Sequence, residues 1–273
     1  MRQRKKIEIC RIVFVALTAC VAHPVIAGPV DLPASLPNFF GGGIGTTTEY
    51  AGGKERVIGV LPGLRYTTAS GHLLEWYGPY AQFNFGSSTG FQWGPALSLR
   101  LGRHDVDDPV VSQIHTIPTT VEGGGFAGYE YIHSGAFPYR LRGELTVSTN
   151  AGFVFTGARV SLTGTAWIPL STRFYTGVGL GASWASGGFN TTYFGVTNED
   201  SARSGLPAYS PSSGVEQITS WLACVYQINA RWYAGALIFY QRLTGPAADS
   251  PIVVQRGTRN QVTVGAGIAY AFR

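Results

Sequence analysis

Hydrophobic side chains alternate with small or polar ones over long stretches of this chain, and this period of two constrains the fold more than any other feature. Nearly every second residue is apolar from Phe91 to Gly102, and the pattern recurs in 174–184 and 262–272. A period of two places successive side chains on opposite faces of a β-strand. The alternation therefore predicts an all-β protein.

Strand length and composition favour a membrane barrel over a soluble β-sandwich. The segments run for about ten to fourteen residues, whereas soluble strands have about five or six and tilted membrane strands about 9–11. Only 13% of residues are charged, about half the usual share. The polar faces are rich in Gly, Ser, Thr and Arg, which suits a crowded barrel interior. Aromatic residues near segment ends, such as Trp93, Tyr139 and Trp184, match interfacial girdles.

The spacing of the segments predicts the topology. Eleven segments can be counted, at 38–50, 56–68, 72–86, 90–102, 119–132, 137–149, 153–168, 172–186, 215–228, 230–242 and 260–272. Single-chain bacterial barrels have an even number of strands. We therefore predict a transmembrane antiparallel up-and-down β-barrel of 12 strands, with 10 as the alternative, in one domain over 38–273. The long connections 103–118, 187–214 and 243–259 are expected outside, and the short turns in the periplasm.

The amino terminus resembles an export signal. Five basic residues precede the apolar run from Ile12 to Ala22, and small residues follow Pro24. This order is that of a secretory signal peptide. We predict a signal peptide over 1–27 with cleavage after Ala27, a short lead over 28–37, and transport to the outer membrane of a Gram-negative bacterium. Lipidation at Cys20 is the rival interpretation.

Removal of residues 1–27 changes the charge and the cysteine content. The mature chain keeps 15 basic and 14 acidic side chains, a net charge of +1, so the whole-chain pI of about 9.2 does not indicate a nucleic-acid partner. Cys224 is the only cysteine left, which excludes an internal disulfide. No Cys/His spacing of the zinc type is present, and we expect no metal and no cofactor.

Three motifs suggest chemistry, and each has a simpler interpretation. The run 123–128 matches G-x-G-x-x-G, but it lies within a predicted strand and no helix follows. His104 stands near three aspartates, Asp105, Asp107 and Asp108, on a predicted outer loop, where a solvated loop is favoured over a calcium or protease site. His133 and Ser134 share a tight turn without an orienting group. We therefore predict no catalytic residues and a protein that is not an enzyme.

Charged side chains that point into the barrel are the most informative polar residues. Alternation places seven of them inside: Arg65, Arg100, Glu130, Arg140, Arg142, Glu144 and Arg159. They can form a structural ladder that fills a narrow barrel, or they can line an anion-preferring path. We favour the ladder, because charges in a low-dielectric interior need partners. A narrow porin-like channel for small solutes is the alternative function.

Segments of the outer loops resemble a known family. They are Tyr193-Phe194-Gly195-Val196-Thr197, Ser204-Gly205-Leu206-Pro207-Ala208-Tyr209 and 242–252 with its Ala248-Asp249-Ser250-Pro251 core, followed by Asn260-Gln261. Together they resemble the MltA-interacting protein/OmpV family, over the mature chain from about Phe39. Pro246 replaces the usual acidic or amide residue. Family members tend to end on an aromatic residue that the barrel-insertion machinery recognises, and here Tyr270 and Phe272 form that signal. In this chain Arg273 follows Phe272.

The resemblance implies partners as well as a fold. It implies contact with outer-membrane lipid and lipopolysaccharide, and with the barrel-insertion machinery. In some members it implies a scaffold that links a lytic transglycosylase to a murein (peptidoglycan) synthase, or a surface-interaction protein. The short predicted periplasmic turns offer little area compared with about 800 Å² per partner in a standard interface.

Overall fold

A computed structural model describes residues 36–272 of the chain. The expected signal peptide, both candidate processing sites at Cys20 and Ala27, most of the predicted lead 28–37, and Arg273 lie outside the described residues.

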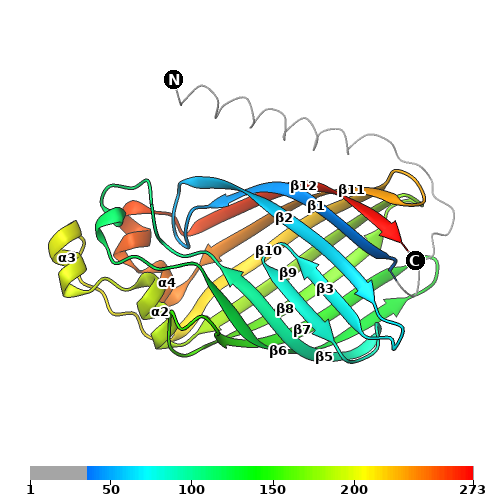
Figure 1. The fold of residues 1–273 in the computed structure, drawn as a ribbon, viewed down its shortest axis with the longest axis horizontal. Helices are drawn as coiled ribbons and strands as arrows, with labels where there is room; N and C mark the ends of the chain where they lie inside the picture. Colours follow the sequence, from blue (N-terminus) through cyan, green and yellow to red (C-terminus); the bar gives the residue numbers. More distant parts are fainter. Residues whose placement is uncertain (1–35, 273) are drawn as a thin grey trace, which may run out of the picture.

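Twelve antiparallel strands form one closed barrel, in which each strand pairs with its sequence neighbours and β1 pairs with β12 (Figure 1). This confirms the predicted count of twelve. The strands are β1 Asn38–Thr48, β2 Arg56–Thr67, β3 Leu73–Tyr77, β4 Tyr80–Asn84, β5 Gly90–Arg100, β6 Thr120–His133, β7 Tyr139–Asn150, β8 Ala158–Pro169, β9 Phe174–Ala185, β10 Gly214–Gln227, β11 Trp232–Leu243 and β12 Asn260–Phe272.

The predicted extent of two segments was wrong. The segment 72–86 is not one strand but a hairpin, β3 and β4, which turns at Gly78 and Pro79; Gly78 has φ +57, a left-handed conformation that glycine adopts readily. This hairpin supplies the strand missing from the count of eleven. The segment 153–168 starts as a strand only at Ala158, because Phe153 and Gly157 have positive φ and belong to the connection before it.

The outer face of the barrel is apolar. Side chains such as Ile44, Leu162 and Leu180 point outward and are exposed, while their strand neighbours point inward. A face of this kind suits the hydrocarbon of a bilayer. The high exposure of these apolar side chains is therefore expected, because in the membrane they contact lipid.

The connections differ between the two ends of the barrel. The three long ones gather at one end, on the left in Figure 1, and the short turns and the carboxyl terminus lie at the other. The long connections carry short helices that the alternation did not predict, namely η1 Val111–Gln113, α2 Gly187–Phe194, α3 Asn198–Ser204, α4 Gly245–Ala248 and η2 Ile252–Arg256. Within residues 36–272, every helix is too short or too polar to cross a membrane.

Glycines line the seam between the first and last strands. Gly43 lies opposite Gly267 and Gly45 opposite Gly265 on the inward face. A Cβ on Gly43 would lie 2.4 Å from the carbonyl oxygen of Ala266, and one on Gly267 would lie 2.6 Å from that of Gly42. Both positions therefore require glycine, because any side chain would strike the backbone of the neighbouring strand.

Candidate functional site

An ion-pair network fills the half of the barrel interior, or lumen, that is nearer the short turns. Glu75 of β3 accepts from Arg65 of β2 at 2.5 Å and from Arg142 of β7 at 2.9 Å. Arg142 also donates to Glu144 at 2.5 Å, and Tyr80 of β4 donates to the same carboxylate at 3.1 Å. Strands β3 and β7 are not neighbours, so these bonds cross the lumen.

A neighbouring pair completes this inner cluster. Arg140 of β7 donates to Glu130 of β6 at 2.7 Å, and both side chains are buried. Gln82 of β4 adds a hydrogen bond to Glu75 at 2.6 Å. The inner cluster thus joins β2, β3, β4, β6 and β7 and contains three arginines and three glutamates.

A second, outer cluster lies near the long connections. Arg159 of β8 donates to Glu122 of β6 at 3.0 Å and to Glu216 of β10 at 2.9 Å, and Arg100 of β5 forms an ion pair with Glu122. Both carboxylates are almost completely buried. Two arginines therefore balance two glutamates, and buried charges arranged in this way satisfy one another.

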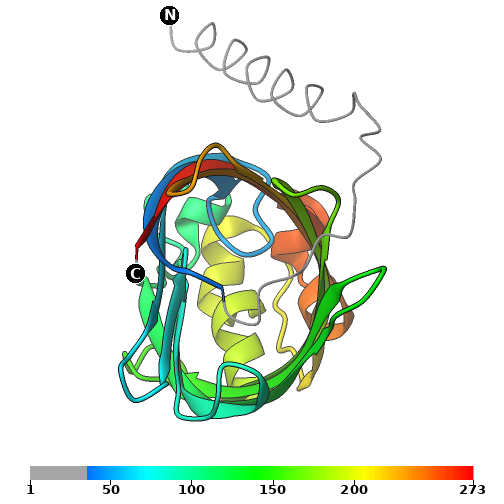
Figure 2. The same ribbon diagram turned by 90° about the vertical axis from the view of Figure 1, so that its right-hand side faces the viewer.

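Helix α2 covers the outer cluster. The guanidinium carbons of Arg100 and Arg159 lie 4.8 and 5.2 Å from the ring centre of Phe189, and Arg100 lies 5.4 Å from that of Tyr193. A guanidinium over an aromatic face is attracted by the ring quadrupole. Figure 2 looks along the barrel from the turn end and shows helical segments across its bore. Helix α2 is thus fixed as a plug by the charges beneath it.

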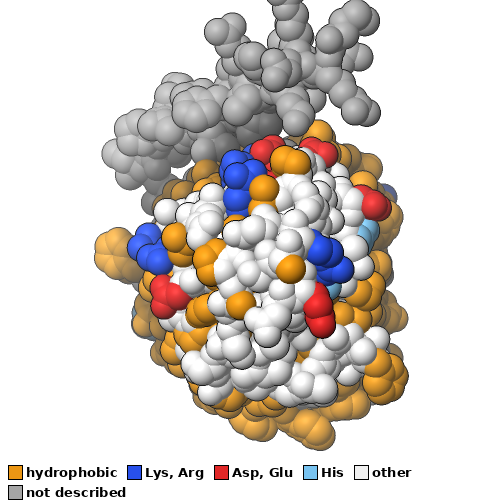
Figure 3. Space-filling model, turned by 90° about the vertical axis from the view of Figure 1, so that its left-hand side faces the viewer, with side chains coloured by type: hydrophobic (Ala, Val, Ile, Leu, Met, Phe, Trp, Pro, Cys, Tyr) orange, Lys and Arg blue, Asp and Glu red, His pale blue; other side chains and the backbone are white. Residues whose placement is uncertain are grey.

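The long connections pack together into what we call the cap, residues 101–119, 186–213 and 244–259. Two apolar clusters hold them, with Ile117, Phe155, Ala185, Phe189, Tyr193, Phe194, Leu243, Ala247, Ala248 and Val253 in one and Tyr50, Val111, Ile114, Val196, Leu206 and Ile252 in the other. Figure 3 views this end and shows a continuous surface in which basic and acidic side chains are scattered. The cap covers the outer mouth of the barrel.

The family loop motifs form the centre of the cap. Tyr193, Phe194 and Gly195 are buried at the end of α2, and the Ser250 hydroxyl donates to the Phe194 carbonyl at 2.6 Å. The other motif residues take supporting places: Ser204 and Gly205 end α3, Leu206 is buried, Pro207 is exposed, Ala248 and Pro251 are buried, and Asp249 is exposed beside Arg259. The motif therefore specifies how two loops meet.

Asp200 locks helix α3 to the first cap loop. Its fully buried carboxylate lies 2.6 Å from Nδ1 of His115 and accepts from the backbone N–H of His115 at 2.8 Å and from Arg203 at 2.6 Å. Burial alone raises the pKa of Asp200, but hydrogen bonds from His115, Arg203 and the Thr197 backbone outweigh it and hold the pKa below its ordinary value. Burial likewise lowers the pKa of Arg103, which donates to the Tyr193 carbonyl at 2.9 Å, to about 10.

The depressed pKa of Asp200 predicts an acid-sensitive cap. The stabilisation is fully present above the unfolded pKa of about 3.9 and is lost as the pH falls towards the lower folded value. Asp200→Asn is expected to remove this acid dependence and to destabilise the cap by about 1–3 kcal/mol. Hydrogen exchange of 111–117 and 196–206 between pH 3 and pH 7 measures both effects. Asp249→Asn, at an exposed pair, is the control, and an equal response of the two variants would contradict the lock.

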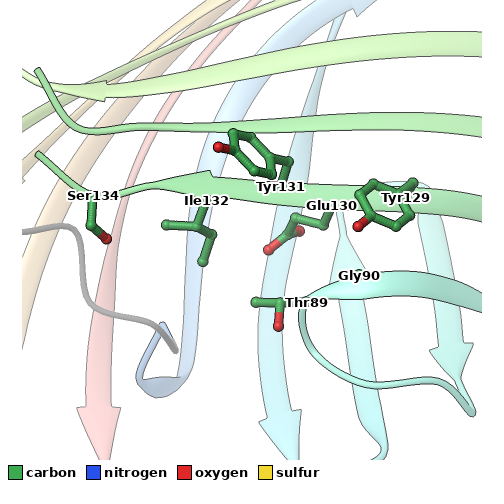
Figure 4. Close-up of a pocket in the computed structure, with 7 residues that line it drawn as sticks. All are labelled: Thr89, Gly90, Tyr129, Glu130, Tyr131, Ile132 and Ser134. Atoms are coloured by element: carbon green, nitrogen blue, oxygen red, sulfur yellow. The ribbon is translucent and has the colours of Figure 1, made fainter.

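The remaining candidate sites offer little chemistry. A shallow pocket of about 390 Å³ lies at the turn end, where Glu130 and Ile132 project to one side of β6 and Tyr131 to the other (Figure 4). Its carboxylate is already paired with Arg140. On the first cap loop, Asp108 forms an ion pair with Arg256 at 2.9 Å. Over the described residues, no three His, Cys, Asp or Glu side chains gather as a metal site.

The structure brings the seven inward charges predicted from alternation into the two clusters, and adds three that were not named. Glu75, Glu122 and Glu216 are the carboxylates that receive most of the arginine contacts. Glu122 has the same parity as Glu130 on β6, so the alternation contained the signal for it. Glu75 was hidden by the unrecognised hairpin.

The aromatic residues of the last strand lie on the outer face at the turn end. Tyr270 packs against Trp232 and Phe40 with ring centres 5.2 and 5.6 Å apart, and Phe272 lies 5.9 Å from Phe40. They form part of an aromatic girdle. Their role as an insertion signal stays a prediction.

Comparison with solved structures gives outer-membrane barrels of low similarity. OmpT of Vibrio cholerae is 8% identical, with 86% of this chain and 96% of that chain covered and a TM-score of 0.39. The anion-selective porin from Comamonas acidovorans is 10% identical, with 87% and 99% covered and a TM-score of 0.34. Neither likeness bears on function.

Sequence relatives are more specific. Proteins named MltA-interacting protein from Escherichia coli strain K12 and from Shigella flexneri are each 33% identical over 94 residues, 34% of this chain. The match spans only 36% of the length of each relative. The family described as "MltA-interacting protein MipA" matches residues 40–272, nearly the whole described barrel. The chain therefore belongs to the MipA family of MltA-interacting proteins.

Proposed function

We propose that this outer-membrane barrel is a non-enzymatic scaffold that binds a murein hydrolase of the MltA type and, through it, a murein synthase. The observation that carries the proposal is the pairing of the lumen charges: each of the five arginines and five glutamates in the two lumen clusters has an oppositely charged partner, and the cap covers the outer mouth. The charged residues of the lumen therefore support the barrel, and its outer surfaces are available to protein partners.

The paired charges also weigh against the alternative of an anion-preferring channel. Anion-selective pores use rings of Arg or Lys, and a carboxylate beside each guanidinium cancels the positive potential that such a ring supplies. In the outer cluster, Arg159 is held between Glu122 and Glu216. This arrangement supports the structural ladder.

The names of the relatives indicate the partner class, and the turn end faces the periplasm, where murein lies. Among the turn residues, Phe137 between β6 and β7 has 86% of its surface exposed. Exposed aromatic side chains are frequent anchors of protein interfaces. We therefore place the partner surface around Phe137.

Phe137→Ser is expected to weaken binding of a purified MltA-type lytic transglycosylase by about tenfold, because loss of an aromatic anchor costs roughly 1–2 kcal/mol. Biolayer interferometry on the full chain in nanodiscs measures the Kd. Phe153→Ser is the matched control, since Phe153 is 96% exposed at the opposite end. If the unchanged chain does not bind the transglycosylase, the scaffold proposal is wrong. If the two variants weaken binding equally, the partner surface is not at Phe137.

A further inference from the structure

The short hairpin β3–β4 leaves the outer half of β2 without a neighbouring strand on one side, while β1 pairs with it on the other. Strand β3 pairs with β2 only from Gly63 to Thr67, and the last bond on that side runs from the Gly78 N–H to the Pro62 carbonyl. Over the described residues, 56–61 pair with β1 alone. At the level of the hairpin, β2 and β5 are separated by three inter-strand spacings, about 14 Å. Figure 1 shows far-wall strands β9 and β10 past the hairpin.

Exposure shows that nothing in the described chain fills this gap. The five residues from Arg56 to Val60 are all exposed, whereas exposed and more buried residues alternate along β5. Ile58 and Val60 point outward and are 64% and 78% exposed. Gly59 points inward, and a Cβ built on it meets no atom within 4 Å. The gap is therefore open from the lipid side and from the lumen.

The free edge of β2 exposes backbone polar groups at membrane depth. Because the Pro62 carbonyl points towards β3, the N–H and C=O groups of Val60 and Ile58 point the same way, with no β3 residue opposite them. Backbone groups at this depth are tolerated without a strand partner only where they are buried in protein or line a water-filled cavity, so an edge that faces lipid requires an occupant.

The gap has a closed rim. The Asp107 N–H donates to the Glu49 carboxylate at 3.3 Å and joins the first cap loop to the β1–β2 turn above the gap. Leu99 and Leu101, at the end of β5, are exposed on the side of the gap that lies across from β2. We call the opening bounded by 56–61, 78–79, 99–101 and the Glu49–Asp107 contact the lateral window.

The window opens between Arg100, which is paired with Glu122, and the uncharged flank of the lumen formed by β1, β12 and β11. The inward residues of β11, β12 and β1 carry no charge, and apolar side chains that remain partly accessible include Trp167, Trp221, Val225, Leu237 and Phe239. The indoles of Trp167 and Trp221 lie 5.9 Å apart, against Gly177 and Gly179 of β9. Accessible apolar surface in a concave site is what an apolar ligand requires.

We propose that the lateral window admits an acyl chain of an outer-leaflet membrane lipid into the uncharged part of the lumen. Three features together select this ligand. The window opens into hydrocarbon, the cap blocks the aqueous route from outside, and the inward residues of the adjoining strands β1, β12 and β11 carry no charge. The ester or amide carbonyl of an acylated lipid also supplies the acceptor that the N–H groups of Ile58 and Val60 lack. This inference does not depend on the scaffold proposal.

Bromine quenching of tryptophan fluorescence tests the window, because bromine quenches an indole only at short range and most strongly at contact. Trp76, Trp93, Trp184 and Trp232 point outward, and replacing all four with phenylalanine leaves the two lumen indoles. In nanodiscs of phospholipid brominated along its acyl chains, this variant is expected to lose most of its fluorescence relative to unbrominated discs. Unchanged fluorescence would overturn the proposal.

A blocked window provides the control. Gly59→Phe, added to the four-fold variant, places a ring in the opening and is expected to restore the fluorescence. Gly164→Phe is matched to it, since a Cβ there also meets nothing within 4 Å but points to lipid on β8; it should leave the quenching unchanged. Equal quenching in both would refute entry through the window. A separate experiment adds brominated stearic acid to nanodiscs of unbrominated phospholipid. If the free acid quenches the indoles and brominated phospholipid does not, the assignment to a membrane lipid is wrong.

Discussion

Arg159→Leu is expected to lower the free energy of unfolding of the barrel by about 3–5 kcal/mol, the usual cost of removing one partner of a buried ion pair. Arg159 lies between Glu122 and Glu216, and its loss leaves Glu216 buried without a cation. Urea unfolding in lipid vesicles, followed by tryptophan fluorescence, measures the change.

The controls separate charge from packing. Arg173→Leu, in an exposed turn, should change the stability by no more than about 0.5 kcal/mol. Adding Glu216→Leu to Arg159→Leu should recover part of the loss, because the stranded carboxylate is removed with its partner. A loss below about 1 kcal/mol in the single variant would contradict the view that these charges support the barrel.

Replacing residues 187–213 with a short Gly-Ser turn is expected to turn a silent barrel into a conducting one. The replaced segment contains α2, whose Phe189 and Tyr193 lie over Arg100 and Arg159. Without it the outer mouth loses its plug, and the arginines meet water. Planar-bilayer recording should show conductance steps for the variant and none for the unchanged chain.

A second shortened barrel guards against artefacts of deletion. Replacing the turn 134–137 at the opposite end with Gly-Ser should leave the bilayer silent, since no plug residue is removed. Gel mobility with and without boiling verifies that each variant has folded. Conductance steps from the unchanged chain would favour the channel over the ladder.

Alternation was sufficient to predict most of the barrel, because each strand contacts lipid on one face and lumen on the other. It placed Arg65, Arg140 and Arg159 inside, and it grouped Glu130 and Glu144 with them. It did not find the hairpin at Gly78 and Pro79, where the inward side chains change from odd positions such as Glu75 to even ones such as Gln82, because strands of five residues are too short for that change to stand out. The Gly-Pro pair was the available signal for a turn.

The cap could not be predicted in the same way. Its contacts join residues far apart in sequence, such as Asp108 with Arg256 and Ser250 with Phe194. No local period encodes such contacts. The helix starts were visible in principle, because Thr197 and Asp200 form a capping box at α3. The lateral window could not be predicted either, because it arises from the shortness of the β3–β4 hairpin relative to β2.

The glycine seam has a consequence for the order of assembly. The pairing of β12 with β1 closes the ring, since every other pair in the barrel joins strands that are consecutive in sequence. At Gly43 and Gly267 this pairing brings backbone against backbone, with no side chains to interlock. Closure at these glycines therefore needs no side-chain rotamers to fit, in contrast to the turn end of the same seam, where Phe40 packs against Tyr270 and Phe272. A single alanine at either glycine is expected to stall the nascent barrel at its final step, as an open sheet.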